Sequence, residues 1–204
     1  MEHVTGNSPK SIAIIGCGPT MQDYVNIMAS QKSAEFNVDE VWGINLAGAA
    51  IRTDLTFYMD DMALLKSLNA DAGYENVPAP RITSVPRIEG DIAFPLAEIL
   101  NIPGARAYLN HTAAYVMAYA IALGVESIAV FGCDYISKVH PYAAGDDDAP
   151  ARYMACMAFW SGIAAARGIH VTVTPNSPLL DADQGARENF YGYIVPPTVK
   201  HEGE

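Results

Sequence analysis

Short apolar runs alternate along this chain with longer segments in which apolar and polar residues are mixed. Runs rich in β-branched and aromatic residues that stop at Gly, Asn, Asp or Pro predict β-strands. Such runs cover residues 11–15, 40–44, 55–59, 81–85, 127–131 and 170–173. Between them, the pattern predicts helices over residues 21–31, 62–68, 95–100, 112–123 and 151–167.

This alternation predicts the class of fold. Apolar strands that alternate with helices are typical of a parallel sheet covered on both faces. We therefore expect a single-domain α/β fold of the Rossmann-like, doubly wound kind, with a mostly parallel sheet. Ligands bind such folds at the carboxyl ends of the strands. Small or polar residues follow most of the predicted strands, and loops favour the same residues for turn geometry alone: Gly16, Gly18, Asn45, Asp60, Asp61, Asp134, Tyr135, Asn176 and Ser177.

Composition supports an ordered, soluble chain. Half of the 204 residues are hydrophobic and 17% are charged, which suits a buried core. We expect one nucleotide-binding domain over residues 1–194 and a mobile C-terminal tail over residues 195–204, where prolines and charges gather. The N-terminus has no signal-peptide core, and no apolar run is long enough to cross a bilayer. A cytoplasmic location without membrane contact is therefore expected.

Charge and cysteine content limit the partners. The net charge of −11 argues against stable binding to nucleic acid, which requires a basic surface. Cys17, Cys133 and Cys156 are too far apart for a zinc or disulfide pattern and are expected to be buried free thiols. The aromatic and methionine side chains of the helix over residues 151–167 predict core packing and part of a homo-oligomer interface.

The first strand ends in a glycine turn that suits a phosphate. Gly16 and Gly18 permit a tight turn and a close approach to a ligand. The helix that follows would direct its N–H groups and positive dipole end at an anion. The dinucleotide fingerprint requires a third glycine at position 21 and an acidic residue after the second strand, where this chain has Met21 and Asn45. The turn therefore predicts a nucleotide that is held by a different scheme.

Several segments carry a resemblance when they are taken together. They are GCGPTM at residues 16–21, the strand that ends at Asn45, HTAAYVMAYAIALGVESIAVFGCDY at residues 111–135, and TPNSPLL at residues 174–180. They resemble, in order, the bacterial sialyltransferases of the Campylobacter type and the related motility accessory factor and 6-hydroxymethylpterin pyrophosphokinase-like proteins. Small proteins of this kind are common among bacteriophages, so the resemblance also points to a viral source.

The resemblance implies a glycosyltransferase that moves a sugar from a CMP-sugar or similar nucleotide sugar to a hydroxyl acceptor. It implies a Rossmann-like fold and no required metal ion. It places the nucleotide against Gly16, Cys17, Gly18, Pro19, Thr20, Asn45, Thr112, Gly132, Asp134, Tyr135, Asn176 and Ser177. It also implies a tyrosine that steadies the leaving phosphate, and Tyr142 has the matching spacing, eight residues after Asp134.

Two departures from the family pattern affect the chemistry. Cys17 stands where the family has an Asn, and a thiol is a poor substitute for an amide. Residues 148–152, where the family has its general-base histidine, contain no histidine. The candidates for the base are therefore His140 and the acidic Asp61, because His is the usual base near neutral pH. His111 is a further candidate.

Three alternatives stay open at this stage. A pyrophosphokinase-like phosphoryl transferase would use Mg²⁺ held by Asp60, Asp61 and Asp134. A non-catalytic nucleotide-binding module is favoured by the two departures. An NAD-binding domain ranks last. The acceptor is also open: a glycan, a small metabolite or a modified base in viral DNA.

Overall fold

The computed structural model describes residues 3–4, 6–30, 36–60, 73, 76–78, 80–135 and 148–181. The strands are β1 (Ser11–Ile15), β2 (Glu40–Ile44), β3 (Leu55–Tyr58), β4 (Arg81–Thr83), β5 (Asp91–Ala93), β6 (Ser127–Phe131) and β7 (His170–Val173). The helices are α1 (Met21–Ala29), α2 (Ala47–Ala50), α4 (Leu96–Ile99), α5 (Thr112–Leu123) and α6 (Ala149–Ala166). Short 3₁₀ turns are η3 (Ala105–Tyr108) and η4 (Leu179–Asp181).

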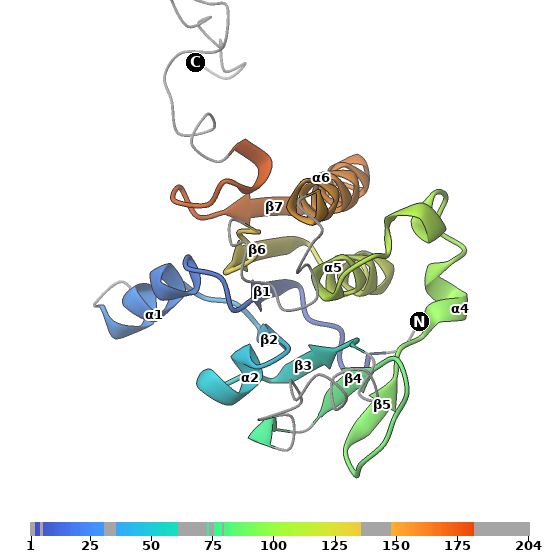
Figure 1. Cartoon of the computed structure of the whole chain (residues 1–204), viewed down its shortest axis with the longest axis horizontal. Helices are drawn as coiled ribbons and strands as arrows, with labels where there is room; N and C mark the ends of the chain where they lie inside the picture. Colours follow the sequence, from blue (N-terminus) through green and yellow to red (C-terminus); the bar gives the residue numbers. More distant parts are fainter. Residues whose placement is uncertain are drawn as a thin grey trace, which may run out of the picture.

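The strands form one parallel sheet of seven strands in the order β5-β4-β3-β2-β1-β6-β7 (Figure 1). The chain moves outward from β1 to β5, then returns to the other side of β1 for β6 and β7. The expected Rossmann-like, doubly wound α/β fold is confirmed. The direction of the chain across the sheet reverses between β1 and β6, which is where such folds leave room for ligands.

Alternate residues of the strands supply two cores, one on each face of the sheet. Ile12 and Ile14 of β1 belong to the larger core, which α5 and α6 cover. Ala13 and Ile15 point to the opposite face, where they pack with Tyr24 of α1. Because a parallel sheet has helices on both faces, its strands lack a polar side, which explains the continuous apolar runs.

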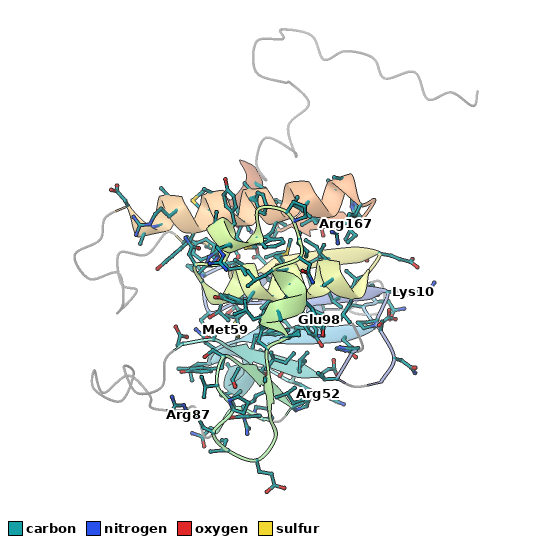
Figure 2. The ribbon with its side chains drawn as sticks, turned by 90° about the vertical axis from the view of Figure 1, so that its right-hand side faces the viewer. Lys10, Arg52, Met59, Arg87, Glu98 and Arg167 are labelled. Atoms are coloured by element: carbon teal, nitrogen blue, oxygen red, sulfur yellow. The ribbon has the colours of Figure 1, made fainter. Side chains whose placement is uncertain are left out.

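Helix α5 is buried on nearly every side because it packs on β3 of the sheet, on the neighbouring α6 and on α4. It begins and ends where the sequence predicts, and Gly124 ends it with a φ of 78°. Figure 2 shows Lys10, before β1, and Met59, after β3, at opposite edges of the sheet, with Arg167 at the end of α6 on the side of Lys10. Helix α6 therefore runs antiparallel to the strands, and its first turn lies at their carboxyl edge.

The sequence predictions differ from the structure mainly in short elements. β5 was not predicted, because it has three residues between loops and its pattern carries no period. The sequence analysis also missed α2, which has only four residues. Its Gly48 packs closely on β3, where a Cβ would lie 2.4 Å from the Thr56 hydroxyl oxygen. α6 begins before Pro150, since proline is tolerated in a first turn. Other helix and strand ends shift by one or two residues.

Some sequence predictions concern residues that the structure does not describe. The helix over residues 62–68 and the tail over residues 195–204 lie outside the described residues. The assignment of residues 1–194 to one domain stays a prediction.

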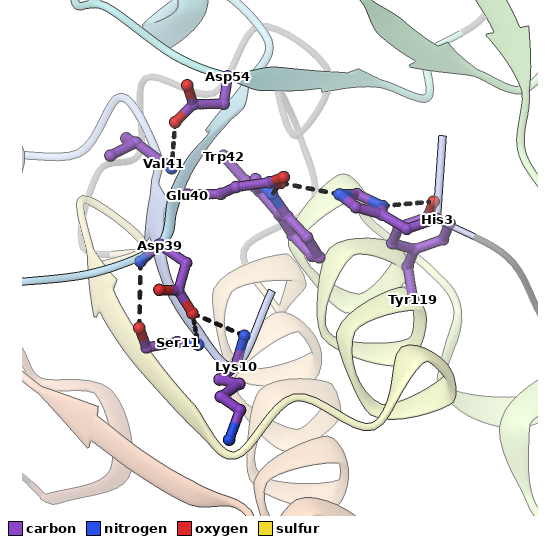
Figure 3. Close-up of polar contacts among 9 residues, drawn as sticks. All are labelled: His3, Lys10, Ser11, Asp39, Glu40, Val41, Trp42, Asp54 and Tyr119. Atoms are coloured by element: carbon purple, nitrogen blue, oxygen red, sulfur yellow. Dashed lines mark hydrogen bonds and ion pairs between the residues drawn. The ribbon is translucent and has the colours of Figure 1, made fainter. Parts of the chain in front are cut away.

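A buried polar cluster holds the N-terminal segment to the amino edge of the sheet (Figure 3). His3 is 4% exposed, and its Nε2 lies 2.8 Å from Glu40 Oε2. The same carboxylate oxygen accepts a hydrogen bond from Trp42 Nε1, and His3 Nδ1 lies 3.2 Å from the Tyr119 hydroxyl. Burial raises the pKa of Tyr119 to about 12. This cluster joins β2 to α5 at the edge opposite the carboxyl ends of the strands.

Replacing Asp39 with Asn should destabilise the fold at neutral pH and have little effect in acid. The Asp39 carboxylate accepts the N–H groups of Ser11 and Lys10 at 2.9 and 2.7 Å, which lowers its pKa (Figure 3). A depressed folded-state pKa adds stability above the ordinary carboxyl pKa, and that stability is lost as the pH falls through the folded-state value. Melting temperatures of wild type and Asp39→Asn, measured from pH 7 down to about 2, should therefore converge.

The control for Asp39→Asn is Glu89→Gln, which removes one negative charge from an exposed loop. A difference between wild type and Asp39→Asn that stays constant over the whole pH range would contradict the assigned role of the ionised carboxylate.

Candidate functional site

The turns that follow β1 and β6 touch each other where the chain direction across the sheet reverses. The Gly16 N–H donates to the Phe131 carbonyl at 2.8 Å, and the Gly18 N–H donates to the Gly132 carbonyl at 2.7 Å. Both turns lie at the carboxyl edge, because β1 and β6 are parallel neighbours. The sequence-predicted glycines are therefore brought together.

These glycines are required for contact between the two turns. A Cβ on Gly16 would lie 2.3 Å from the Gly132 carbonyl oxygen, and a Cβ on Gly132 would lie 2.2 Å from that of Gly16. Gly132 also has a φ of 67°, which favours glycine. A Cβ on Gly18 would lie 2.8 Å from Asp134 Oδ2. The glycine turn therefore packs closely against the turn after β6 of the same chain.

Asp134 is 1% exposed and joins the turns by hydrogen bonds. Its Oδ2 accepts the Thr20 N–H at 2.7 Å, and its Oδ1 accepts the hydroxyl groups of Thr20 and Ser177 at 2.5 and 3.1 Å. The Thr20 hydroxyl oxygen in turn accepts the Gly132 N–H at 2.8 Å. A carboxylate is favoured at the positive end of α1. The N-terminus of α1 therefore already faces an anion that the protein supplies.

The turn after β7 is held to α1 by Asp23, a residue that the sequence analysis missed. Thr174 donates its hydroxyl to Asp23 Oδ2, and Asn176 Nδ2 lies 3.2 and 3.1 Å from the two Asp23 oxygens. Ser177 accepts the Leu179 N–H at 3.2 Å. The sequence signal was only an acidic residue in the first turn of a helix. Three strand ends, those of β1, β6 and β7, are thereby connected.

Asn45 follows β2 and has an unsatisfied side-chain oxygen. Its φ of 53° lies in the left-handed region, which costs energy for any residue with a Cβ but least for Asn. Its N–H donates to the Phe57 carbonyl at 2.9 Å. Its Oδ1 is buried and has no hydrogen-bond partner in the part of the chain that the structure describes. Buried polar atoms without a partner are rare, so this oxygen requires an explanation.

Cys17 lies beside the end of β2, and its Sγ is 3.7 Å from the Ile44 carbonyl oxygen. The expectation that all three thiols are buried is wrong here: Cys17 is exposed, whereas Cys133 and Cys156 are buried. Cys17 lies in the turn after β1, beyond the last residue of the buried strand. Pro19, in the same turn, is also exposed.

An aromatic cluster lies where α5 and α6 begin. The His111 ring stacks on Tyr153 with centroids 4.9 Å apart and meets Tyr135 edge-on at 5.0 Å. Tyr135 has a φ of 49°, and burial raises its pKa well above the ordinary value. Thr112, the first residue of α5, is 8% exposed. His111 directly precedes Thr112 and contacts the Tyr135 ring. The sequence-predicted Thr112 and Tyr135 therefore lie near each other at the carboxyl edge of the sheet.

The catalytic candidates from the sequence, His140, Tyr142 and Asp61, lie outside the described residues, and their roles stay predictions. Within the described ranges, no group of three His, Cys, Asp or Glu side chains is placed to hold a metal ion. Asp134, one of the three carboxylates that the pyrophosphokinase alternative requires, instead accepts hydrogen bonds from Thr20 and Ser177.

Comparison with known proteins shows the same fold in solved sialyltransferase structures. No family model and no curated protein matches the sequence. The structure of the sialyltransferase CstII from Campylobacter jejuni with the substrate analogue CMP-3FNeuAc superposes with a TM-score of 0.53, at 17% identity over 83% of each chain. A CstII structure with cytidine-5′-monophosphate gives 0.51, at 15% identity over 92% of this chain and 85% of that one.

A third structure, CST-II in complex with a trisaccharide acceptor and CMP, gives a TM-score of 0.50 at 14% identity over 82% of this chain and 83% of that one. None of the described helices is both long and apolar enough to cross a membrane. The chain has the α/β fold of these sialyltransferase structures.

Proposed function

We propose that this protein transfers a sugar from a nucleotide-activated donor, a CMP-sugar or a similar nucleotide sugar, to a hydroxyl group. The nucleotide would bind at the carboxyl ends of β1, β2 and β6. The sequence motifs resemble those of sialyltransferases, and the fold agrees with that of sialyltransferase structures with CMP and a CMP-sugar analogue. Both likenesses support the same class of donor.

Asn45 is the observation that carries the proposal. Leaving its buried Oδ1 without a donor costs about 1–3 kcal/mol. A cytidine nucleotide has donors that would satisfy this oxygen, in the ribose hydroxyl groups and the cytosine amino group. Backbone strain that persists at a strand end is commonly associated with ligand binding. We infer that Asn45 binds the nucleoside part of the donor.

The remaining polar features fit a leaving phosphate. Helix α1 faces the Asp134 carboxylate, which would repel a phosphate. Helix α5 has no acidic residue in its first turn, and the side chain of its N-cap residue makes no capping hydrogen bond. Its positive end and the Thr112 hydroxyl would therefore stabilise the charge that develops on the phosphate as the sugar departs.

The nucleotide-binding role of Asn45 is tested with Asn45→Gly. Glycine accepts the left-handed φ, so the change removes the amide and keeps the backbone. We expect CMP affinity, measured by isothermal titration calorimetry, to fall about tenfold, the equivalent of one hydrogen bond. The melting temperature should change little. The same substitution at the exposed Asn101 is the matched control and should leave CMP affinity unchanged.

Three results would contradict the proposal in different ways. If the wild-type protein binds no cytidine nucleotide and no nucleotide sugar, the proposed donor site does not exist. Binding of ATP with Mg²⁺ in place of CMP would favour the pyrophosphokinase-like alternative. CMP binding without turnover of any CMP-sugar would favour a non-catalytic nucleotide-binding module. The viral source, the cytoplasmic location and the homo-oligomer remain predictions from the sequence.

A further inference from the structure

We propose that Asp23 orients the side chain of Asn176 so that the site selects a cytosine base over a uracil base. The inference rests on the proposed function and assigns the residues that recognise the base of the nucleotide. Asn176 follows β7, and its neighbour Ser177 donates a hydrogen bond to Asp134 in the turn after β6. Asn176 therefore lies at the carboxyl edge of the sheet, beside the proposed nucleotide site.

The hydrogen bonds of Asp23 determine which way the amide of Asn176 faces. Asn176 Nδ2 donates to Asp23 Oδ1 and Oδ2 at 3.2 and 3.1 Å, and the Thr174 hydroxyl donates to the same carboxylate. A carboxylate accepts hydrogen bonds and donates none, so it binds the amide nitrogen and not the amide oxygen. The Oδ1 atom of Asn176 is therefore directed away from Asp23.

The amide oxygen of Asn176 is available to a ligand. Asn176 is exposed, whereas Thr174 and Ser177 of the same turn are 8% and 5% exposed. In the part of the chain that the structure describes, the Asn176 side chain forms hydrogen bonds only through Nδ2. The buried neighbours hold the turn in place. An acceptor that is fixed before binding loses little conformational freedom when a ligand binds.

An outward-facing amide oxygen favours a pyrimidine that presents an amino group. Cytosine has an amino group at C4, which donates hydrogen bonds, whereas uracil has a carbonyl oxygen at that position, as thymine does. An amide oxygen that faces a carbonyl oxygen leaves both acceptors without a donor, and this costs binding free energy. In this orientation Asn176 therefore accepts a hydrogen bond from cytosine and disfavours uracil.

The separation of Asn45 and Asn176 suits the two ends of one nucleoside. β1 and β6 lie between β2 and β7 in the sheet, so the ends of β2 and β7 are about 14 Å apart. A nucleoside with an asparagine side chain at each end spans a gap of this size. The turns between them have glycine at positions 16, 18 and 132, which place no side chain in the way. The ribose hydroxyl groups would bind Asn45, and the base would extend to Asn176.

Isothermal titration calorimetry with CMP and UMP on the full-length protein tests the inference. We expect the wild type to bind CMP about tenfold more tightly than UMP, the equivalent of one hydrogen bond. Asp23→Asn should bring the two affinities close together, because the new amide can donate to Asn176 Oδ1 and let Nδ2 face the base. The oxygen of the new amide still accepts from Thr174, so the turn should stay in place.

A reciprocal variant separates orientation of the amide from support of the turn. Asp23→Asn combined with Asn176→Asp moves the carboxylate to the turn after β7. There it accepts a hydrogen bond from the new amide and again presents an oxygen to the base. We expect this double variant to regain a preference for CMP of about tenfold. Glu126→Gln removes an exposed carboxylate before β6, at the amino edge of the sheet, and is the matched control; it should keep the wild-type ratio of affinities.

The outcomes separate this inference from the proposed function. If the wild type binds CMP and UMP equally, or binds UMP more tightly, the inference is overturned and the proposed function stands. If Asp23→Asn weakens both nucleotides by the same factor, or keeps the wild-type ratio, Asp23 only supports the turn and the inference is overturned. A double variant that does not regain the preference for CMP also overturns it. A wild-type protein that binds neither nucleotide overturns both.

Discussion

Replacing Asp134 with Ala lowers the free energy of unfolding by about 3–5 kcal/mol. The change removes a buried carboxylate that accepts two hydrogen bonds from Thr20 and one from Ser177. Hydrogen bonds to a charged group contribute about 1.5–3 kcal/mol each, and the donors left behind are buried and unsatisfied. Urea unfolding at neutral pH measures the loss.

Two further variants show whether the loss comes from the hydrogen bonds of Asp134. Ser177→Ala removes one of the three bonds to the carboxylate and should cost about 1.5–3 kcal/mol, less than Asp134→Ala. Glu89→Ala, in an exposed loop, is the control for loss of a carboxylate and should cost less than about 0.5 kcal/mol. An Asp134→Ala protein as stable as the Glu89→Ala protein would contradict the role of Asp134 in joining the turns.

Replacing Arg81 with Met should destabilise the protein by a similar amount, about 3–5 kcal/mol, because it leaves a buried charge without its partner. Arg81 Nε lies 2.7 Å from Asp91 Oδ1, and the two side chains are 6% and 0% exposed. The Arg81 guanidinium also donates to the carbonyls of Val77 and Glu89 at 2.8 and 2.5 Å. Urea unfolding again measures the effect.

A double-mutant cycle identifies the pair as the cause. Because Arg81→Met combined with Asp91→Asn leaves no buried net charge, the double variant should lose less than the two single variants added together. Asp91 Oδ2 also accepts the N–H groups of Arg87 and Ile88, and Asn can keep these bonds through its side-chain oxygen. Additive losses would show that the two side chains stabilise the fold independently.

Local patterns predicted the longer helices and most strands well. Burial on one side gives such an element a helical or alternating hydrophobic period, and burial on both sides gives it a continuous apolar run. Helix α5, β1, β2, β6 and β7 begin and end as the pattern predicts. β5 and α2 were missed because three or four residues are too few to show a period. The α/β class follows from the alternation of strands and helices, which is a property of the sequence alone.

The candidate site was found from the sequence in part. The rule that ligands bind at the carboxyl ends of parallel strands predicted that Gly16, Asn45, Asp134 and Ser177 lie at one edge, and the parallel sheet places them there. The hydrogen-bond partners of these residues were not predictable. Thr20 and Asp134 are 114 positions apart, and no local period records a contact at that separation.

By itself, the sequence determined the class of fold, the long helices and strands, and the edge at which polar residues collect, because these depend on local patterns of burial and on turn chemistry. Only the tertiary structure decided what each polar group does there. It packs the glycine turn against Gly132 and directs Asp134 to the start of α1, and it leaves Asn45 Oδ1 without a partner. The physical reason is that hydrogen-bond satisfaction depends on neighbours that are distant in the chain and close in space.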